Sequence, residues 1–332
     1  MNEKIDFVIT WVDGNDPEWV KEKDKYSEKN IRYDNRSNRY RNWDNLKYWF
    51  RGVEKYAPWV NKIYFVTCGQ KPEWLNENNE KLVLINHEDY IPKEYLPTFN
   101  SNVIEINFHR IKELSENFVL FNDDTFIINK TNPTDFFKNG LPCDTALLTA
   151  IVAYDKDNFS KVQIANMGII NSYFKKENVI NKNIFKWFNI KYGVNVFRNI
   201  ILMPFHHIPG IYDLHLPCSC KKSVIKKIWE LEPEIMEETS KSRFRDNNTN
   251  INQWLFRYWN ICEGNFMPRS IKFGKKFQYE ENNEKMYKAI RQQKYKTICL
   301  NDTDLNYDFE KEKEETINCL ESIFPEKSSF EK

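Results

Sequence analysis

The sequence predicts an α/β fold built on a mostly parallel, twisted sheet that is flanked by helices. Strand-like and helix-like segments alternate through the first 130 residues, as expected for strands joined by helical crossovers. The 332-residue chain contains 41% apolar and 15% aromatic residues, so it can bury a sizeable core as one large domain or two smaller ones. It has no internal repeat and no glycine-rich phosphate loop, which argues against P-loop and dinucleotide-binding folds.

The chain begins with an expected strand at residues 5–12, IDFVITWV, which are rich in β-branched and aromatic side chains. The turn-forming residues 13–17, DGNDP, end this strand. The polar residues 18–38 predict a helix and a loop. Residues 43–56 repeat apolar side chains at helical spacing and predict a second helix, which Pro58 terminates.

The next segments continue the alternating pattern. Residues 62–67 and 81–86 predict two further strands, residues 101–115 an amphipathic helix, and residues 117–121 a fourth strand. Ligands of such sheets bind beyond the carboxyl ends of the strands. We therefore expect the residues that follow strands 5–12 and 117–121 to lie at one rim of the sheet.

The second half of the chain is less regular. An aromatic, amphipathic stretch at residues 184–200 predicts a helix within a lid or insert at about 175–200. The later elements expected are a helix from Ser219 or Ser223, a helix at 251–261, a strand at 296–300 and a charged helix at 308–323.

Charge and cysteine content restrict the function. The 49 Lys and Arg residues balance 48 Asp and Glu residues, which argues against nucleic acid as the main partner. The seven cysteines are an odd number without zinc-ligand spacing, which predicts reduced thiols and a cytoplasmic protein. We expect neither a signal peptide nor a membrane span.

A polar cluster, Asn122-Asp123-Asp124, follows the apolar run 117–121. Adjacent carboxylates repel each other and usually persist where a cation neutralises them. Two carboxylates and a carboxamide at a sheet edge are suited to hold a divalent metal on a nucleotide-sugar diphosphate. A solvated turn is the alternative interpretation, because Asn and Asp also favour turns.

Several stretches resemble the conserved regions of the Stealth proteins, the sugar-1-phosphate transferases of bacterial capsules and exopolysaccharides, whose family includes the animal N-acetylglucosamine-1-phosphotransferase. Residues 5–19, IDFVITWVDGNDPEW, are similar to the first region, and residues 39–137, which include LPTFNSNVIEINFHRIKELSENFVLFNDD, to the second. Leu214-His215-Leu216-Pro217 resembles the third region, and residues 244–258 resemble the fourth. The ending FPEKSSFE is also similar to bacterial members.

The resemblance implies a GT-A-like glycosyltransferase fold, with a catalytic domain at residues 1–270 and a C-terminal extension at residues 271–332. It also implies transfer of hexose-1-phosphate or N-acetylhexosamine-1-phosphate from a UDP-sugar to a hydroxyl of a growing capsular polysaccharide, with release of UMP. The acceptor would be a glycan or a lipid-linked oligosaccharide. The alternatives are a hexosyltransferase that releases UDP and a non-catalytic glycan-binding protein.

The acidic cluster then has expected roles. Asp123 and Asp124 would be ligands of Mg²⁺ or Mn²⁺, with Asp123 also a catalytic carboxylate. Which of the two contacts the metal is left open. Asn122 would orient a neighbour or donate a hydrogen bond to phosphate.

The end of the first strand would bind the nucleotide through Trp11, Asp13 and Gly14. Gly14 would permit close approach of the backbone, and Asp13 would bond ribose or base unless it only forms the turn. Arg51 and Lys47, one turn apart on the helix at 43–56, predict a diphosphate clamp. For Arg51 the alternative is a surface ion pair with Asp44 or Glu54.

Three residues from separate segments complete the predicted site. His215, expected just before a helix N-terminus, would be neutral and accept the proton of the acceptor hydroxyl. Arg245 would clamp phosphate. The family usually has an acidic residue a few positions later, where this sequence reads Asn247-Asn248-Thr249-Asn250, and Asp246 or Asn250 would take its place. His109, spaced i, i+4 from Glu105, would either orient the substrate site or stabilise its helix.

A basic patch of four lysines is expected on the helix that follows His215 (Lys221, Lys222, Lys226 and Lys227). It predicts contact with an anionic glycan or with anionic lipid headgroups, and hence peripheral association with the inner face of the cell membrane. A solvated helix face is the alternative.

Overall fold

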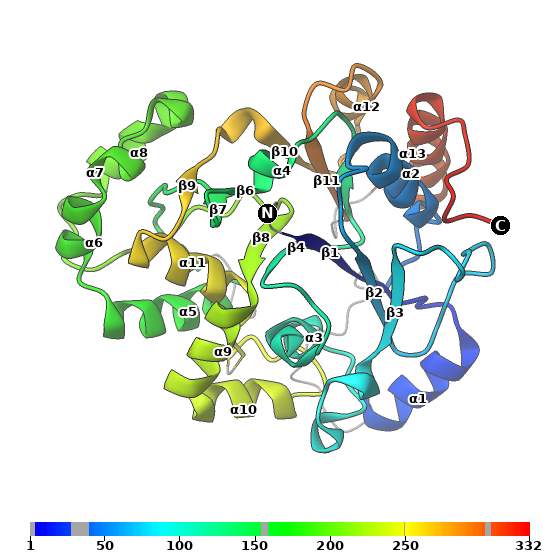
Figure 1. Ribbon diagram of the computed structural model, residues 1–332, viewed down its shortest axis with the longest axis horizontal. Helices are drawn as coiled ribbons and strands as arrows, with labels where there is room; N and C mark the ends of the chain where they lie inside the picture. The colour runs from blue at the N-terminus through cyan, green and yellow to red at the C-terminus, as the bar shows by residue number, and fades with distance from the viewer. Residues whose placement is uncertain (1–3, 28–39, 154–158, 249, 303–306) are drawn as a thin grey trace.

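The centre of the molecule is a five-stranded sheet with the strand order β3-β2-β1-β4-β8 (Figure 1). The computed structural model describes residues 4–27, 40–153, 159–248, 250–302 and 307–332, so the end of the predicted loop at 18–38 and Thr249 lie outside the described residues. The strands are β1 (Ile5–Thr10), β2 (Ile63–Thr67), β3 (Leu82–Asn86), β4 (Asn117–Phe121) and β8 (Cys218–Lys221).

Four of these strands run parallel, and only β8 is antiparallel to its neighbour β4. The predicted α/β fold with a mostly parallel sheet is therefore confirmed. The strand β8 was missed, because its sequence, CSCK, is short and lacks the β-branched pattern that marks the other strands.

Helices cover both faces of this sheet because its side chains are buried on both. On β1, Phe7 and Ile9 belong to one hydrophobic core and Val8 to the other. The first core includes side chains of α2 (Leu46–Tyr56), α12 (Glu284–Arg291) and α13 (Phe309–Ile323). The second includes side chains of α3 (Ser101–Ile106), α9 (Lys222–Leu231), α10 (Pro233–Lys241) and α11 (Trp254–Glu263).

The C-terminal segment shares a sheet with the N-terminal half. β11 (Thr297–Asn301) pairs in parallel with β10 (Gly274–Gln278) and antiparallel with β5 (Thr125–Ile127). Because β5 follows the acidic cluster directly, this pairing brings residues near 300 beside residues near 124. A third small sheet contains β6 (Phe137–Lys138), β7 (Leu141–Asp144) and β9 (Met267–Pro268).

Two predicted helices are shorter than expected. The helix at 101–115 is α3, which ends at Ile106 and continues as a 3₁₀ turn at Phe108–Arg110. The buried amide of Asn107 donates to the carbonyl of Val103 at 2.9 Å and to Ser240 Oγ at 3.2 Å, and such local bonds compete with a continuing helix.

The insert is a chain of short elements rather than one helix. It contains α6 (Lys176–Lys182), α7 (Ile184–Trp187), the 3₁₀ segment η5 (Ile190–Asn195) and α8 (Val196–Ile201). Gly193 interrupts it with φ of 53°. The remaining helices are α1 (Pro17–Ser27), α4 (Pro133–Phe136) and α5 (Ser160–Tyr173).

All seven cysteines are free thiols, as predicted, and Cys68 alone is exposed. Across the described ranges, no helix combines the length and apolar character needed to cross a bilayer.

Candidate active site

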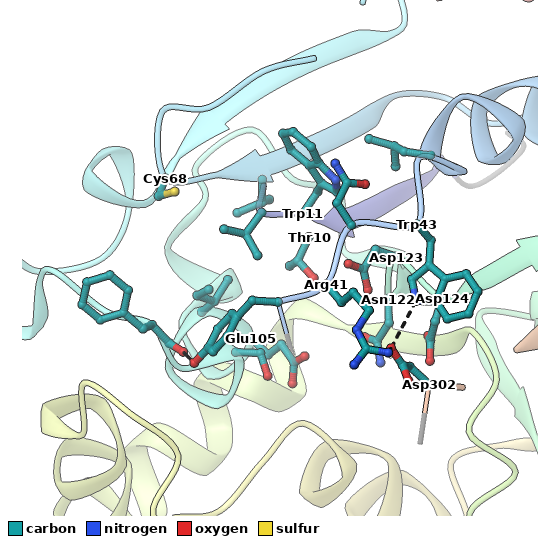
Figure 2. A pocket seen from close by; sticks show the side chains of 18 of the residues that line it. Thr10, Trp11, Arg41, Trp43, Cys68, Glu105, Asn122, Asp123, Asp124 and Asp302 are labelled. Atoms are coloured by element: carbon teal, nitrogen blue, oxygen red, sulfur yellow. Dashed lines mark hydrogen bonds and ion pairs between the residues drawn. The ribbon is translucent and has the colours of Figure 1, made fainter. Parts of the chain in front are cut away.

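A cavity of about 240 Å³ lies where β1 and β4 end. These strands are paired so that Ile9 is opposite Phe121, and the residues that follow each strand therefore enter the same cavity. Figure 2 shows Asn122, Asp123 and Asp124 close to Asp302, while Trp11 and Trp43 form part of the surrounding wall. The structure thus confirms that the two strand ends share one rim.

The turn between β4 and β5 fixes the acidic cluster. The carbonyl of Asn122 accepts from the amide of Thr125 at 3.0 Å and from its hydroxyl at 2.8 Å. The carbonyl of Asp124 accepts from the amide of Leu300 at 2.8 Å, which ties the turn to β11. The cluster is therefore a turn, as the alternative interpretation stated, but its side chains line a cavity rather than an open surface.

Asp124 lies between two side chains from distant segments. Its Oδ2 accepts from the thiol of Cys299 at 3.2 Å and lies 3.6 Å from Nε2 of His215. Its Oδ1 is buried and has no hydrogen-bond partner among the described residues. A buried carboxylate oxygen without a partner is costly, so this oxygen is suited to bind a cation or a hydrogen-bond donor.

The two carboxyl groups have opposite pKa shifts. Burial in the cavity wall and the neighbouring charge of Asp124 raise the pKa of Asp123 to about 7. Burial would also raise the pKa of Asp124, but hydrogen bonds from His215 and Cys299 and the charge of Lys276 outweigh it and lower that pKa. Asp124 is therefore the carboxylate that stays ionised when the site holds no cation.

His215 has a backbone conformation that a side-chain-bearing residue rarely adopts, with φ of 49°. Its ring packs edge-on against Trp254, at 5.9 Å between ring centroids. The expected helix N-terminus is not adjacent, because β8 separates His215 from α9. What positions His215 is thus the approach to β8 and the contact with Trp254, not a helix dipole.

Arg245 lies in the same cavity, where one guanidinium nitrogen donates to Ser101 Oγ at 2.6 Å. Its charge acts on both Asp123 and Glu105, lowering the pKa of each against the effect of burial. The pKa of Glu105 still rises to about 7, because burial is the larger effect. Arg245 is therefore a fixed positive charge near the carboxyl groups.

Asp302 is a cavity residue that the sequence prediction missed. It accepts from Trp43 Nε1 at 3.3 Å and from Tyr307 at 2.5 Å, and it lies 3.5 Å from Arg41. Trp43 in turn stacks on Tyr279, with 4.2 Å between ring centroids. The sequence did contain a pattern that could have indicated this residue, because Asn301-Asp302 lies at the end of β11 much as Asn122-Asp123-Asp124 follows β4.

The predicted nucleotide contacts of Asp13 and Gly14 are not supported, although Trp11 lines the cavity as expected. Asp13 stabilises the turn, since its Oδ1 accepts from the amide of Asn15 at 3.0 Å. Gly14 packs on Tyr40, whose carbonyl oxygen would lie 2.0 Å from an added Cβ. The absence of a side chain at Gly14 therefore lets Tyr40, a residue of the cavity wall, pack closely there, and it is not needed for a ligand.

Arg51 and Lys47 do not form the predicted diphosphate clamp. Both lie outside the cavity lining. Arg51 is buried, with Nε and Nη2 donating to the two carboxylate oxygens of Glu331 at 2.8 and 2.9 Å, and Nη1 donating to the carbonyl of Phe324 at 2.7 Å. Lys47 lies over the ring of Tyr48. Arg51 therefore fastens the C-terminus to α2.

We expect Arg51→Met to lower the free energy of unfolding by about 3 kcal/mol, because Glu331 would be left buried without its counterion. The folded fraction should keep wild-type turnover. Chemical denaturation and a rate normalised to folded protein measure the two effects. Arg51→Met combined with Glu331→Met is the matched control and should recover part of the stability. If Arg51→Met were folded but had lost most of its turnover, the prediction that Arg51 binds the diphosphate would be supported after all.

His109 also lies outside the cavity lining, against the ring of Trp229 at 5.6 Å. Burial, together with the charge of Arg110, lowers its pKa from 6.5 to about 4. A role in substrate binding is therefore not supported, and the predicted pairing with Glu105 is broken because α3 ends between them.

The depressed pKa of His109 predicts a pH-dependent stability. Below pH 6.5 the unfolded chain binds a proton that the folded chain excludes, so this contribution to stability is lost as the pH falls toward 4. Between pH 7 and 5, wild type should lose about 2 kcal/mol more than His109→Gln, measured by urea denaturation. His206→Gln, at an exposed histidine, is the control and should lose as much stability as wild type over the same pH range. If the free energy of unfolding of wild type and of His109→Gln fell equally with pH, the lowered pKa of His109 would be contradicted.

The cavity residues fit an oxygen-bound divalent cation. Asp124, His215 and Cys299 bring ligand atoms within 4.8 Å of one another, a mixed set that suits zinc more than magnesium. Burial and the Asp124 charge raise the pKa of Cys299 well above its usual value, so its thiol remains a hydrogen-bond donor. The unpartnered Oδ1 of Asp124, with Asp123 beside it, is the arrangement that Mg²⁺ or Mn²⁺ fits.

Comparisons with known proteins place the chain in a family. Conserved region 1 of the Stealth proteins matches residues 3–31, region 2 matches residues 39–143, and region 4 matches residues 288–332. A capsular polysaccharide phosphotransferase of Streptococcus pneumoniae is 48% identical over 332 residues, which cover 99% of this chain and 98% of the relative. The chain belongs to the Stealth protein family.

Other relatives of this Stealth protein are also phosphotransferases. A receptor polysaccharide phosphotransferase of Streptococcus oralis is 41% identical and covers 99% of both chains. An exopolysaccharide phosphotransferase of Lactiplantibacillus plantarum is 39% identical and covers 99% of this chain and 96% of the relative. This Stealth protein is therefore a phosphotransferase. A bifunctional glycosyltransferase structure covers 90% of this chain and 46% of its own with 9% identity and a TM-score of 0.37, a similarity too low to support an argument.

The matches correct one assignment. Region 4 is the C-terminal segment that contains β11 and α13, and not residues 244–258 as predicted. Arg245 still lines the cavity, although it does not belong to conserved region 4. The residues that region 4 supplies to the cavity are Leu300, Asn301 and Asp302.

Proposed function

We propose that this Stealth protein transfers hexose-1-phosphate from a UDP-sugar to a hydroxyl of a growing capsular or other cell-surface polysaccharide, releasing UMP. The supporting observation is the single cavity that joins an acidic pair, a histidine and an arginine from three distant segments. Its relatives are named as phosphotransferases of capsular, receptor and exopolysaccharides. Such a name fits a product that retains the phosphate, which disfavours a hexosyltransferase that releases UDP and a non-catalytic glycan-binding protein.

In this reaction the acceptor oxygen attacks the phosphorus that carries the sugar. A new phosphorus–oxygen bond forms while the bond from that phosphorus to the bridging oxygen breaks, and UMP leaves with the electron pair. The acceptor hydroxyl proton passes to the imidazole of His215, in the role of general base. Asp124 Oδ2, 3.6 Å from Nε2 of this ring, stabilises the imidazolium that forms.

The donor diphosphate requires positive charge. Asp123 and Asp124 would hold Mg²⁺ or Mn²⁺, and the bound ion would neutralise charge on the phosphate oxygens. Arg245 supplies a second, permanent positive charge from its position near Asp123. Asn122 lines the same part of the cavity and offers an amide donor to phosphate.

The aromatic wall suits the rest of the donor. Trp11, Tyr40 and Trp43 line the cavity, and Trp11 is held by stacking on Phe65 at 5.8 Å. Flat side chains of this kind bind uracil or a sugar ring by stacking and exclude water from the phosphates. The free thiols of the chain fit a cytoplasmic setting.

Product analysis tests the proposal directly. Purified protein is incubated with a panel of UDP-hexoses and UDP-N-acetylhexosamines and an acceptor glycan, and the products are followed by phosphorus NMR. We expect UMP and a sugar phosphodiester in equal amounts. Release of UDP with a glycosidic product would overturn the proposal.

Removal of divalent metal is expected to reduce transfer at least about 100-fold, because the diphosphate would lose a major source of charge neutralisation. The measurement is the rate of UMP release in EDTA, followed by addition of Mg²⁺ or Mn²⁺ in excess of the chelator. Ca²⁺ added in the same way controls for non-specific effects of divalent charge. Transfer that is unchanged in EDTA would refute a metal role for Asp123 and Asp124.

A further inference from the structure

The outer face of the insert exposes large apolar side chains. Ile190 is 94% exposed, Phe185 85%, Val194 78% and Ile201 71%. The insert elements α6, α7 and α8 form an outer corner of the molecule, far from α2 and α13 (Figure 1). We call this surface the insert face, and its exposed apolar members are Ile184, Phe185, Ile190, Val194, Phe197, Ile200, Ile201, Met203 and Phe205.

The insert has apolar side chains on both sides: Val179, Trp187 and Tyr192 are buried in the hydrophobic core, and polar contacts on the same inner side fix its orientation. Asn199 on α8 is fully buried, and its amide donates to the carbonyls of Ala146 and Trp187 at 2.9 and 2.7 Å. The neighbouring Ile200 and Ile201 are exposed. A soluble helix places apolar residues inward, so this arrangement indicates that something else covers the insert face.

The end of the insert is also held in place. Lys176 is buried, and its ammonium donates to the carbonyls of Leu202, Met203 and Phe205 at 2.7, 2.8 and 2.7 Å. These bonds satisfy the carbonyls that follow α8. The apolar side chains are therefore presented by a defined backbone.

The charge of the insert identifies the covering surface. Residues 174–207 contain six Lys or Arg and one Glu, although the whole chain has 49 and 48. Lys175, Lys182 and Lys191 are exposed, and of these Lys191 donates to the carbonyl of Pro268 at 2.8 Å. Apolar side chains flanked by exposed lysines match a bilayer with anionic headgroups, whereas a second copy of this chain would bring like charges together.

We propose that the insert face docks on the surface of an anionic lipid bilayer, with its apolar side chains in the interfacial region. This would hold the protein where a lipid-linked acceptor is available. That benefit rests on the proposed function, but docking itself requires neither donor nor acceptor.

The basic patch predicted from the sequence is not this surface. Lys222 donates to the carbonyls of Ile111 and Lys112 at 2.6 and 3.0 Å, and Lys227 pairs with Glu263. Lys226 lies 3.9 Å from Glu230. Most of the patch charge is therefore engaged within the protein.

Vesicle sedimentation tests the proposal. Wild-type protein is mixed with vesicles of phosphatidylcholine alone or of equal parts phosphatidylcholine and phosphatidylglycerol. We expect binding to the anionic vesicles, and a loss of at least about tenfold in the partition coefficient for Phe185→Ser, Ile190→Ser and Ile201→Ser combined. Lys175→Gln with Lys182→Gln should remove much of the preference for phosphatidylglycerol.

Matched controls lie on the other side of the molecule. Leu84→Ser changes an exposed apolar residue of β3, and Lys285→Gln with Lys288→Gln changes two exposed lysines of α12. Both should bind as wild type does, and circular dichroism checks that every variant is folded. Failure of the wild-type protein to bind anionic vesicles would overturn the proposal. So would light scattering that shows a dimer for wild type and a monomer for the triple apolar variant, because the insert face would then bind a second copy of the chain. Vesicle binding by a protein that releases no UMP from UDP-sugars would contradict the proposed function and leave the docking proposal intact.

Discussion

Replacing Asp124 with asparagine is expected to lower turnover by roughly 1,000-fold or more. The substitution keeps the size of the side chain but removes the charge that Oδ1 would offer to a cation and that Oδ2 offers to His215. UMP release under saturating donor measures the loss. Differential scanning calorimetry should show a folded protein with some loss of stability, because Oδ2 loses its charge-assisted contacts with Cys299 and His215.

Asp308→Asn provides a matched control for this change. Asp308 is the exposed N-cap of α13, where asparagine caps equally well, so turnover should remain within about twofold of wild type. If Asp124→Asn kept more than a tenth of wild-type turnover, neither a metal nor an electrostatic role for this carboxylate would stand.

Replacing His215 with asparagine is expected to lower turnover by about 100- to 10,000-fold while donor affinity changes little. Asparagine tolerates the positive φ of this position better than most residues, so the backbone path into β8 should be preserved. It cannot accept the acceptor proton at physiological pH. Single-turnover rates and donor affinity by calorimetry separate the chemical step from binding.

The exposed His207 gives the matched control, and His207→Asn should leave both quantities unchanged. A His215→Asn protein that lost donor affinity and turnover together would place His215 in donor binding. Full turnover in this variant would remove the general-base assignment.

The sequence predicted the parallel strands well because local signals specify them. β4 was predicted at its observed limits, and β1, β2 and β3 differ from prediction by at most two residues at either end. Apolar, β-branched runs bounded by turn residues carry this information locally. The rule that strand ends share a rim then located Trp11 and the acidic cluster at one cavity.

Helical spacing failed where a partner from elsewhere in the chain decided the role. Lys47 and Arg51 have the spacing of a diphosphate clamp, but Arg51 forms an ion pair with Glu331, which lies 280 residues later in the chain. Likewise Cys299 gave no signal, because its contact with Asp124 exists only through the pairing of β11 with β5. Local pattern carries no information about which distant segment satisfies a buried charge.

The sequence by itself determined the family, the parallel sheet and the acidic cluster at its rim, because these depend on local composition and on motifs that can be recognised in the sequence alone. Only the tertiary structure decided which side chains share the cavity, that one oxygen of Asp124 is buried without a hydrogen-bond partner among the described residues, and which side chains of the insert lie outside. The physical reason is that burial, pairing and exposure are properties of contacts between distant segments, and these are fixed only when the chain packs.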